Sequence, residues 1–368
     1  MATKTKKSKC IKSTKRKEAA IIKQNIGIDI SKDDFKSCIY QLFSNQDSRI
    51  KSSRTFKNNA KGFVTFLTWI KSKCIKTLEI RVTLEATGVY YEQLTYFLDD
   101  NDIYVSVILP NKSKAYAQSL NLKSKTDEID AQMLGQMGLE RNLSRWKAIS
   151  PKMRRLKQLT RERVTIVEEK TALLNKLHAL KSGHQPNSDI IERLGQRITM
   201  LKKQIKEVEK EVKNVIKNDT VLTKHVDNIS TVKGLGAITI ATIIAETDGF
   251  NLFTSRKQLV SYAGYDVVQR QSGSSINACP ETSVGKTKIS KKGNRFIRRA
   301  LHFPAIVAVK YNEQLNQFYK RIEERTAIKM KGYVAVQRKL LLLIYALFKN
   351  EVPFDPDFYK KHSSESSN

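Results

Sequence analysis

Cysteines and long apolar runs are both scarce in this sequence. Its four cysteines are Cys10, Cys38, Cys74 and Cys279, and no two of them form a CxxC pair, so their spacing indicates neither a zinc site nor a disulfide framework. The five histidines show no metal-ligand spacing. No apolar stretch approaches the roughly 18 residues of a membrane span, and the one after the basic N-terminus is too short for a signal peptide. We therefore expect reduced thiols, no membrane partner and a cytoplasmic protein.

Acidic residues are also scarce relative to basic ones. The chain has 36 Asp and Glu against 67 Lys and Arg, which gives a formal net charge of +31. Because the basic excess recurs along most of the chain, it predicts a nucleic-acid partner held through its phosphates and therefore sensitive to salt. With 368 residues, 40% of them hydrophobic, the chain is long enough for two or three domains with cores of their own.

Residues 25–149 show the pattern of an α/β domain. Short strand-like runs such as "NIGIDIS", "FKSCIYQLF" and "LEIRVTLEA" alternate with helical patterns such as "GFVTFLTWIKS". Early strands followed by strand-helix repeats predict a mixed sheet in the order found in RNase H-like folds. Residues 1–24 form a basic tail before this domain.

Residues 150–226 form a charged segment with the pattern of a long helical hairpin, turning at "SGHQPNS". An unbroken heptad in its second half predicts a coiled coil. Pairing between subunits and a simple spacer are both compatible with it. The two seams of the heptad are Ile191, Ile198, Ile205 and Val212, and Leu194, Leu201, Val208 and Val215.

Residues 227–350 are predicted to form a mainly α-helical domain, followed by a flexible tail over 351–368. "VKGLGAITIATIIAE" places a Gly-Leu-Gly turn before an apolar helix, as in helix-hairpin-helix elements whose backbone N–H groups meet a phosphate. Taken alone, this motif is only weak support for DNA binding.

Four carboxylates occupy positions that suit a divalent metal site. Asp29 and Glu85 each lie at or near the end of a predicted strand, and Asp127 and Asp130 are three residues apart, hence on one face of a helix. Carboxylate oxygens are the ligands that Mg²⁺ prefers, and a pair of such ions assists phosphoryl transfer. The alternative is structural: two strand ends, and a helix start with Asp127 as its N-cap.

A serine and a group of basic residues form the second candidate site. Ser272 stands beside a glycine in "RQSGSS", and as a nucleophile it requires activation by a metal, by Arg270 or by a group from elsewhere. An ordinary loop serine is the alternative. Basic residues in "ISKKGNRFIRRAL" suit phosphate contacts, unless they form only a solvated charged face. They are Lys291, Lys292, Arg295, Arg298 and Arg299.

Together these motifs resemble the DEDD transposases, the bridge-RNA-guided insertion-sequence recombinases related to the Piv DNA invertases. "IGIDISKDDF", "LEATGVYYEQL", "KTDEIDAQML", "VKGLGAITIATIIAE", "LVSYAGYDVVQRQSGSS" and "KISKKGNRFIRRAL" occur in the family's order over roughly residues 25–310. The resemblance implies a RuvC-like, RNase H-fold catalytic domain, a coiled-coil linker and a C-terminal transposase domain.

The resemblance also implies an activity and its partners. An acidic tetrad of Asp29, Glu85, Asp127 and Asp130 would hold Mg²⁺, with Mn²⁺ as a substitute, and Ser272 would form a covalent phosphoserine with DNA. The two parts would come from different subunits of a dimer or tetramer. A structured guide RNA would pair with donor and target DNA and so choose the sequence.

The sequence departs from the family in three places. Lys233 stands where proline is common, "NACPETS" after Ile276 looks like an insertion near Ser272, and the basic N-terminus is longer than expected. Two other functions compete with the transposase interpretation. One is a RuvC-like nuclease or resolvase that uses activated water, and the other is a non-catalytic nucleic-acid-binding protein.

Overall fold

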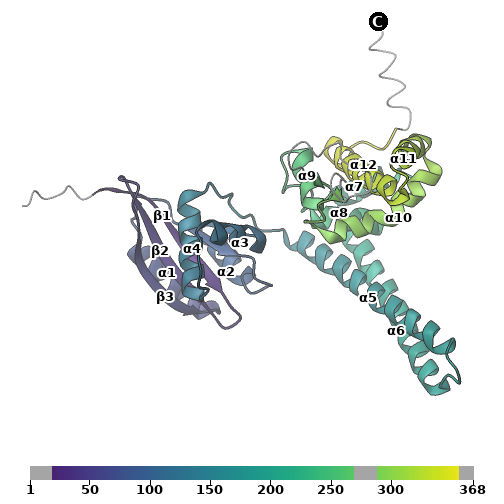
Figure 1. Cartoon of the computed structure of the whole chain (residues 1–368), viewed down its shortest axis with the longest axis horizontal. Helices are drawn as coiled ribbons and strands as arrows, with labels where there is room; N and C mark the ends of the chain where they lie inside the picture. Colours follow the sequence, from purple (N-terminus) through teal and green to yellow (C-terminus); the bar gives the residue numbers. More distant parts are fainter. Residues whose placement is uncertain (1–18, 269–287, 356–368) are drawn as a thin grey trace, which may run out of the picture. The chain divides into compact units, whose positions relative to one another are not determined.

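The computed structural model describes residues 19–268 and 288–355, and the chain divides into two compact units between Ala148 and Ile149. The first unit holds a five-stranded sheet with helices, and the second is mainly helical (Figure 1). Within the described ranges, no helix is both long and apolar enough to cross a membrane.

The sheet of the first unit is mixed, as predicted. Strands β1 (Ile21–Ile30), β2 (Asp34–Phe43) and β3 (Ser48–Lys57) form an antiparallel meander, and β4 (Arg81–Glu85) and β5 (Tyr104–Ile108) run parallel to β1. The strand order β3-β2-β1-β4-β5 is consistent with an RNase H-like fold. β1 is central, which accounts for its long apolar run.

Helices cover both faces of this sheet. On one face, α1 (Ala60–Lys73) and α2 (Glu92–Asp100) share a core with Ile26, Ile28 and Ile30 of β1. On the other face, α4 (Asp127–Glu140) crosses β1 so closely that a Cβ added at Gly27 would lie 1.9 Å from a backbone oxygen of α4. The helix α3 (Pro110–Ser119) packs beside α4. Glycine on β1 therefore permits the approach that places the start of α4.

The second unit begins with the predicted helical hairpin. Its helices α5 (Pro151–Lys181) and α6 (Ser188–Lys217) pack against each other. Within this chain, the apolar heptad side chains of α6 pack against α5 and the adjoining helices. Pairing between subunits stays a prediction. The residues that α6 buries are Leu194, Ile198, Ile205, Val208, Val212 and Ile216.

The rest of the second unit is a helical bundle that shares one apolar core with the base of the hairpin. The Gly-Leu-Gly turn joins α7 (Thr220–Ser230) to the deeply buried α8 (Ala237–Glu246), and Gly234 there has a φ of 99°. The mainly helical prediction is confirmed. The remaining elements are α9 (Arg256–Ala263), β6 (Val267–Val268), β7 (Lys288–Ile289), α10 (Arg295–Tyr311), α11 (Glu313–Thr326) and α12 (Lys329–Asn350).

Candidate active site

Two of the four candidate carboxylates lie at one edge of the sheet. β1 and β4 are parallel neighbours in which Ile28 pairs with Leu84, so the next residues, Asp29 and Glu85, reach the same level at the carboxyl ends of their strands. Glu85 also accepts a hydrogen bond from the hydroxyl of Ser113 on α3. The parallel pairing of β1 and β4 thus brings the two carboxylates to one end of the sheet.

The other two carboxylates are in the first turn of α4. Thr126 is the N-cap, because its hydroxyl oxygen accepts a hydrogen bond from the N–H of Ile129 at 3.2 Å. Asp127 is therefore not the cap, contrary to the structural alternative considered for it. With the capping role taken by Thr126, Asp127 and Asp130 are available for other contacts.

The pKa values show that the four carboxylates interact. Burial raises the pKa of Asp29 to about 6, and the negative charges of Asp130, Asp127 and Glu85 contribute to this rise, while Lys125 opposes it. Burial is also the main reason that the pKa of Asp130 is raised. Such repulsion is typical of acids that lie near one another, so β1, β4 and α4 bring the four carboxylates into one neighbourhood, and their role as a catalytic tetrad stays a prediction.

Lysines partly balance these charges. The Nζ atom of Lys36 lies 3.6 Å from a carboxylate oxygen of Asp127, and that of Lys125 lies 4.0 Å from Asp130. Lys36 is also the register partner of Asp29 on β2. Among the described residues, no three His, Cys, Asp or Glu side chains are arranged to hold a metal ion as they stand. An ion bound by these groups would require their side chains to change position.

The donor set nevertheless fits a hard divalent cation. All four groups offer carboxylate oxygens, which Mg²⁺ and Mn²⁺ prefer, and a cation among them would relieve the repulsion that raises the pKa of Asp29. The four carboxylates thus have the chemistry of a divalent metal site.

A buried polar contact that the sequence analysis missed fixes α4 against the sheet. Asn25 on β1 donates from Nδ2 to the carbonyl oxygen of Gly135 at 3.0 Å and accepts from the hydroxyl of Thr83 on β4 at 3.2 Å. A Cβ at Gly138 would lie 2.2 Å from Asn25. The Gly-x-x-Gly spacing in α4 was the available signal, since two glycines on one helix face permit close backbone contact.

The predicted nucleophile Ser272 lies outside the described residues, as do Arg270 and the insertion after Ile276. The described chain on both sides of residues 269–287 is paired, because Val267 of β6 is the antiparallel partner of Ile289 of β7. This ladder brings the two ends of the Ser272 segment together.

The basic residues after this segment have different surroundings. Arg298 donates to the carbonyl oxygen of Ala263 at 2.7 Å, and Arg299 forms an ion pair with Glu168 of α5. These two arginines therefore have partners within the chain. Among the predicted phosphate-binding residues that the structure describes, Lys291, Lys292, Arg295 and Arg299 are exposed, and Arg298 is half-buried.

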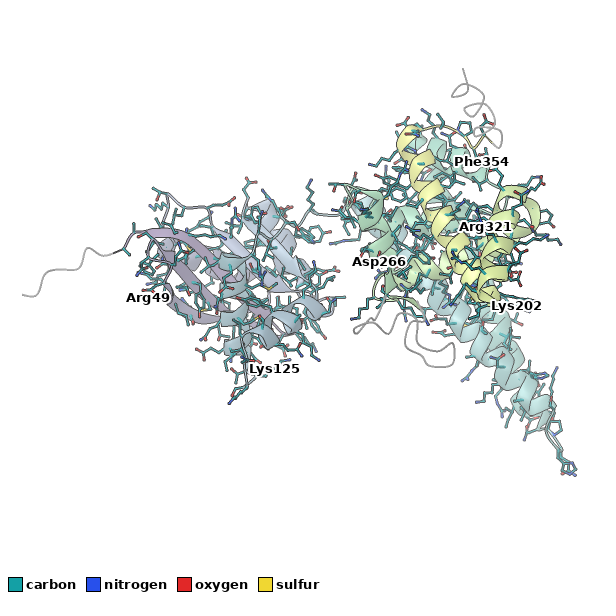
Figure 2. All side chains as sticks on the ribbon, turned by 45° about the horizontal axis from the view of Figure 1, so that its top comes forward. Arg49, Lys125, Lys202, Asp266, Arg321 and Phe354 are labelled. Carbon is teal, nitrogen blue, oxygen red and sulfur yellow. The ribbon has the colours of Figure 1, made fainter. Side chains whose placement is uncertain are left out.

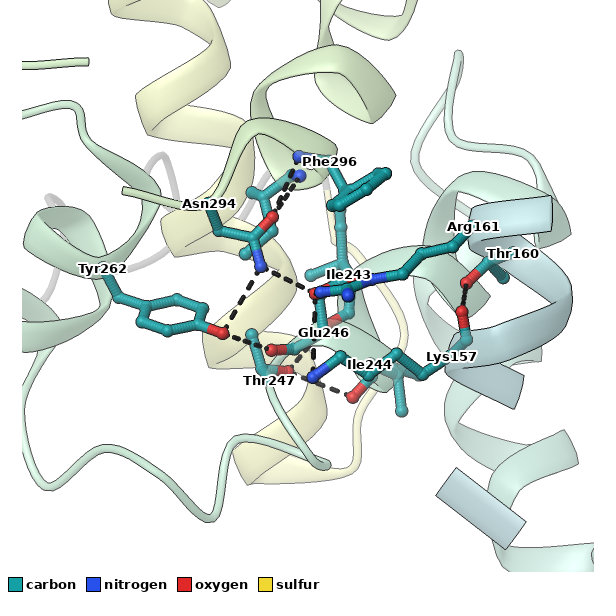
Figure 3. A network of polar contacts seen from close by, with 11 residues as sticks. Lys157, Thr160, Arg161, Ile243, Ile244, Glu246, Thr247, Tyr262, Asn294 and Phe296 are labelled. Atoms are coloured by element: carbon teal, nitrogen blue, oxygen red, sulfur yellow. Dashed lines mark hydrogen bonds and ion pairs between the residues drawn. The ribbon is translucent and has the colours of Figure 1, made fainter. Parts of the chain in front are cut away.

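A buried glutamate near this segment was not anticipated from the sequence. Glu246, at the end of α8, is 0% exposed and accepts two hydrogen bonds from Arg161, from Nε at 2.6 Å and from Nη2 at 2.9 Å (Figure 3). Asn294 donates to the same carboxylate at 2.7 Å, and Lys157 lies at 4.0 Å. Tyr262 donates to the backbone oxygen of Glu246 at 3.1 Å. We call these five residues the Glu246 network.

The Glu246 network joins the hairpin to both flanks of the Ser272 segment. Tyr262 belongs to α9, before the segment, and Asn294 is the N-cap of α10, after it. Arg161 lies on α5. The charges on α5 and α8 thus tie together the described elements on both sides of residues 269–287.

Comparison with known proteins agrees with this architecture. A DEDD transposase model of the IS110 family matches residues 26–186, and a model described as "Transposase IS116/IS110/IS902 family" matches residues 226–320. The chain is 30% identical over 338 residues to proteins of Moraxella lacunata and Moraxella bovis, each named "Pilin gene-inverting protein". Each alignment covers 90% of this chain and 98% of the relative. The chain belongs to the IS110 family of transposases, which are enzymes of DNA recombination.

Proposed function

We propose that this transposase moves an insertion sequence by metal-assisted strand cleavage and exchange through a covalent phosphoserine. The observation that carries the proposal is the convergence of four carboxylates from β1, β4 and α4, which helps to raise the pKa of Asp29 to about 6. A group of acids that repel one another lowers the stability of the fold unless a cation lies among them, and such groups are typical of functional sites.

In the proposed reaction, Ser272 is the nucleophile and the tetrad is the metal site. The serine hydroxyl gives up its proton to a base, its Oγ forms a bond to phosphorus, and one phosphorus–oxygen bond of the DNA backbone breaks. A DNA hydroxyl then attacks the phosphoserine, which restores the serine and joins the strands. Mg²⁺ or Mn²⁺, when bound, would stabilise the negative charge that develops on the phosphate oxygens. It would be held by Asp29, Glu85, Asp127 and Asp130.

The remaining parts of the proposal concern partners. A structured guide RNA that pairs with donor and target DNA is supported by the resemblance to bridge-RNA-guided recombinases and by the basic charge of the chain. A dimer or tetramer in which one subunit's serine meets another's tetrad is supported by the resemblance to that family, since Ser272 and the four acids lie in different halves of the sequence. Sequencing the RNA that copurifies with the protein tests the first part, and recovery of random cellular RNA would count against it.

The test of the chemistry is to trap the covalent intermediate. Wild-type protein, incubated with DNA of the element ends and Mg²⁺ and then denatured, is expected to retain labelled DNA. Ser272→Ala and Asp29→Asn should both lose the adduct, because one lacks the nucleophile and the other a metal ligand, while both keep DNA binding. Ser275→Ala, in the same segment, is the matched control and should behave as wild type.

The same assay separates the proposal from the nuclease alternative. A water-using nuclease would cut DNA without an adduct, and Ser272→Ala would still cut. Recombination by Ser272→Ala would therefore refute the serine assignment, and normal recombination in EDTA would refute the metal.

A further inference from the structure

An acid-free basic segment forms one face of the first unit. Residues 48–78 contain eight Lys or Arg and no Asp or Glu. They fold into β3, α1 and the turn after α1, and we call the exposed side chains of this segment the β3–α1 face. The eight cations are Arg49, Lys51, Arg54, Lys57, Lys61, Lys71, Lys73 and Lys76.

The geometry leaves this face open to solvent. β3 is the outermost strand, paired only with β2, and all of its residues except Ser52 and Phe56 are exposed. Phe56 fastens the strand to the helix, because its ring stacks on Phe35 and meets the edge of Phe66 on α1. Arg49 lies near the start of the strand (Figure 2). Phe56 is thus the one buried side chain of the strand, and every other position except the half-buried Ser52 is exposed.

A groove lies between the strand and the helix. It has a volume of about 440 Å³, and Arg54 from β3 and Lys73 from α1 both line it, together with Thr65, Thr68 and Trp69. Arg54 also lies over the Phe56 ring, with its guanidinium carbon 5.2 Å from the ring centre. The cations therefore border a hollow rather than scatter over a convex surface.

Most of these cations lack an acidic partner. Arg49 is 3.6 Å from Asp47, and Lys57 is 3.8 Å from Asp34, both in exposed pairs. Within the described ranges, no carboxylate pairs with the remaining lysines of the face. These are Lys51, Lys61, Lys71, Lys73 and Lys76.

Protection of the sheet edge accounts for only part of this charge. Lysines on an outer strand hinder pairing with other strands, which explains Lys51. Lys61 and Lys71 lie on α1, away from the strand edge, so edge protection does not require them. Soluble surfaces ordinarily mix positive and negative charges, whereas every charged residue among the 31 residues of this segment is positive. With Ile50 and Val64 the large apolar side chains exposed on this face, a polyanion fits it better than an apolar peptide.

We propose that the β3–α1 face binds the phosphate backbone of the duplex DNA that the transposase cuts. The ten residues of β3 span about 30 Å at ~3.3 Å each, close to one turn of B-DNA. β1 and β3 are both antiparallel to β2, so β3 ends at the edge of the sheet where Asp29 lies. A duplex lying along the face is led toward the carboxylates. The choice of DNA rests on the proposed function, whereas the basic surface itself does not.

The test measures binding without any cleavage. Full-length protein is titrated into a fluorescein-labelled 30-base-pair duplex at 50 to 300 mM KCl without divalent ions, and binding is followed by anisotropy. Arg54→Gln/Lys71→Gln/Lys73→Gln should make the log–log salt dependence less steep by about three, roughly 0.9 for each phosphate that the variant no longer neutralises. Its affinity at 100 mM KCl should fall on the order of tenfold or more.

A matched control removes the same charge from another part of the chain. Lys202, Lys206 and Lys210 are exposed on one face of α6, and changing all three to Gln should leave the salt dependence close to that of wild type. Unchanged urea midpoints by circular dichroism and Trp fluorescence would show that both triple variants fold.

Three results would overturn the proposal. They are wild-type binding by the β3–α1 variant, an equal loss in the α6 control, and a loss confined to a 30-nucleotide single-stranded RNA probe, which would make RNA the occupant. Because no cleavage is measured, failure of the serine or metal chemistry would leave this result interpretable. Conversely, a normal adduct with unchanged DNA binding would refute the face alone.

Discussion

Removal of Arg161, a partly exposed arginine, is expected to destabilise the second unit strongly. Arg161 is 44% exposed, and a surface ion pair normally contributes only about 0–1 kcal/mol. Its partner Glu246, however, is fully buried and receives two of its three close side-chain hydrogen bonds from Arg161. Arg161→Met leaves a buried carboxylate with Asn294 and a lysine 4.0 Å away. Stranding a buried charge in this way costs about 3–5 kcal/mol.

The two units can be followed separately in one urea titration. Both tryptophans, Trp69 and Trp146, belong to the first unit, so Trp fluorescence reports that unit, whereas circular dichroism at the helical band is dominated by the longer helices of the second. At a urea dependence of about 2–3 kcal/mol per M, Arg161→Met should lower the dichroism midpoint by about 1.5 M. The fluorescence midpoint should stay at its wild-type value.

Arg155→Met is the matched control, because Arg155 lies on the same helix. Its carboxylate partner Glu211 is 50% exposed at 3.6 Å, so we expect a loss below about 1 kcal/mol. Combining Arg161→Met with Glu246→Gln should cost less than the sum of the single changes, since both remove the same interaction. Equal, small effects of Arg161→Met and Arg155→Met would show that the buried pair does not stabilise the unit.

Two further predictions concern the first unit, and Trp fluorescence in urea checks both. Gly27→Ala should lower the urea midpoint of the first unit strongly, because the new Cβ would lie 1.9 Å from the Ala131 oxygen. The control is Gly195→Ala in α6 of the second unit, which has nothing within 4 Å of its Cβ position and should stabilise its helix by about 0.5–1 kcal/mol, read from circular dichroism. Equal effects of the two substitutions would contradict the close approach of α4 to β1. The raised pKa of Asp29, about 6 against 3.8, means that the folded unit holds a proton which the unfolded chain releases, so stability should fall as pH rises from about 4 to 6. Asp29→Asn should remove that part of the slope, Mg²⁺ should reduce it in the wild type, and an identical pH profile in the variant would refute the assignment.

Local patterns in the sequence predicted much of the fold, because strands and helices have different periods. Alternating apolar residues marked β1 and β2, and heptads marked α6, whose buried residues lie at predicted heptad positions except for Ile216. Helix α3 was missed, since "PNKSKAYAQS" is polar and buries few side chains. Its contribution becomes visible only in the fold, where Ser113 meets Glu85.

The candidate site was only partly accessible to such reasoning. Asp29 and Glu85 were found because they terminate apolar runs, and a strand end is a local signal. The convergence of α4 on them depends on Gly27 and Gly135, which are far apart in sequence but whose backbones meet in the fold. Nothing in the local pattern around Glu246 distinguished it from an ordinary helix end, since its partner Arg161 is 85 residues away.

Glu246 and the four candidate carboxylates show why the surroundings of an acid, and not its residue type, decide between a structural and a chemical role. The Glu246 carboxylate is occupied by donors of its own chain: Arg161 and Asn294 bond to both of its oxygens. Asp29 instead faces other carboxylates, and their repulsion adds to burial in raising its pKa. A carboxylate that accepts hydrogen bonds at both oxygens has little capacity left for a cation, whereas acids that repel one another and are only partly balanced by lysines gain stability by binding one. The Glu246 network therefore fits a structural role between α5, α8, α9 and α10, and the four carboxylates fit the proposed metal site.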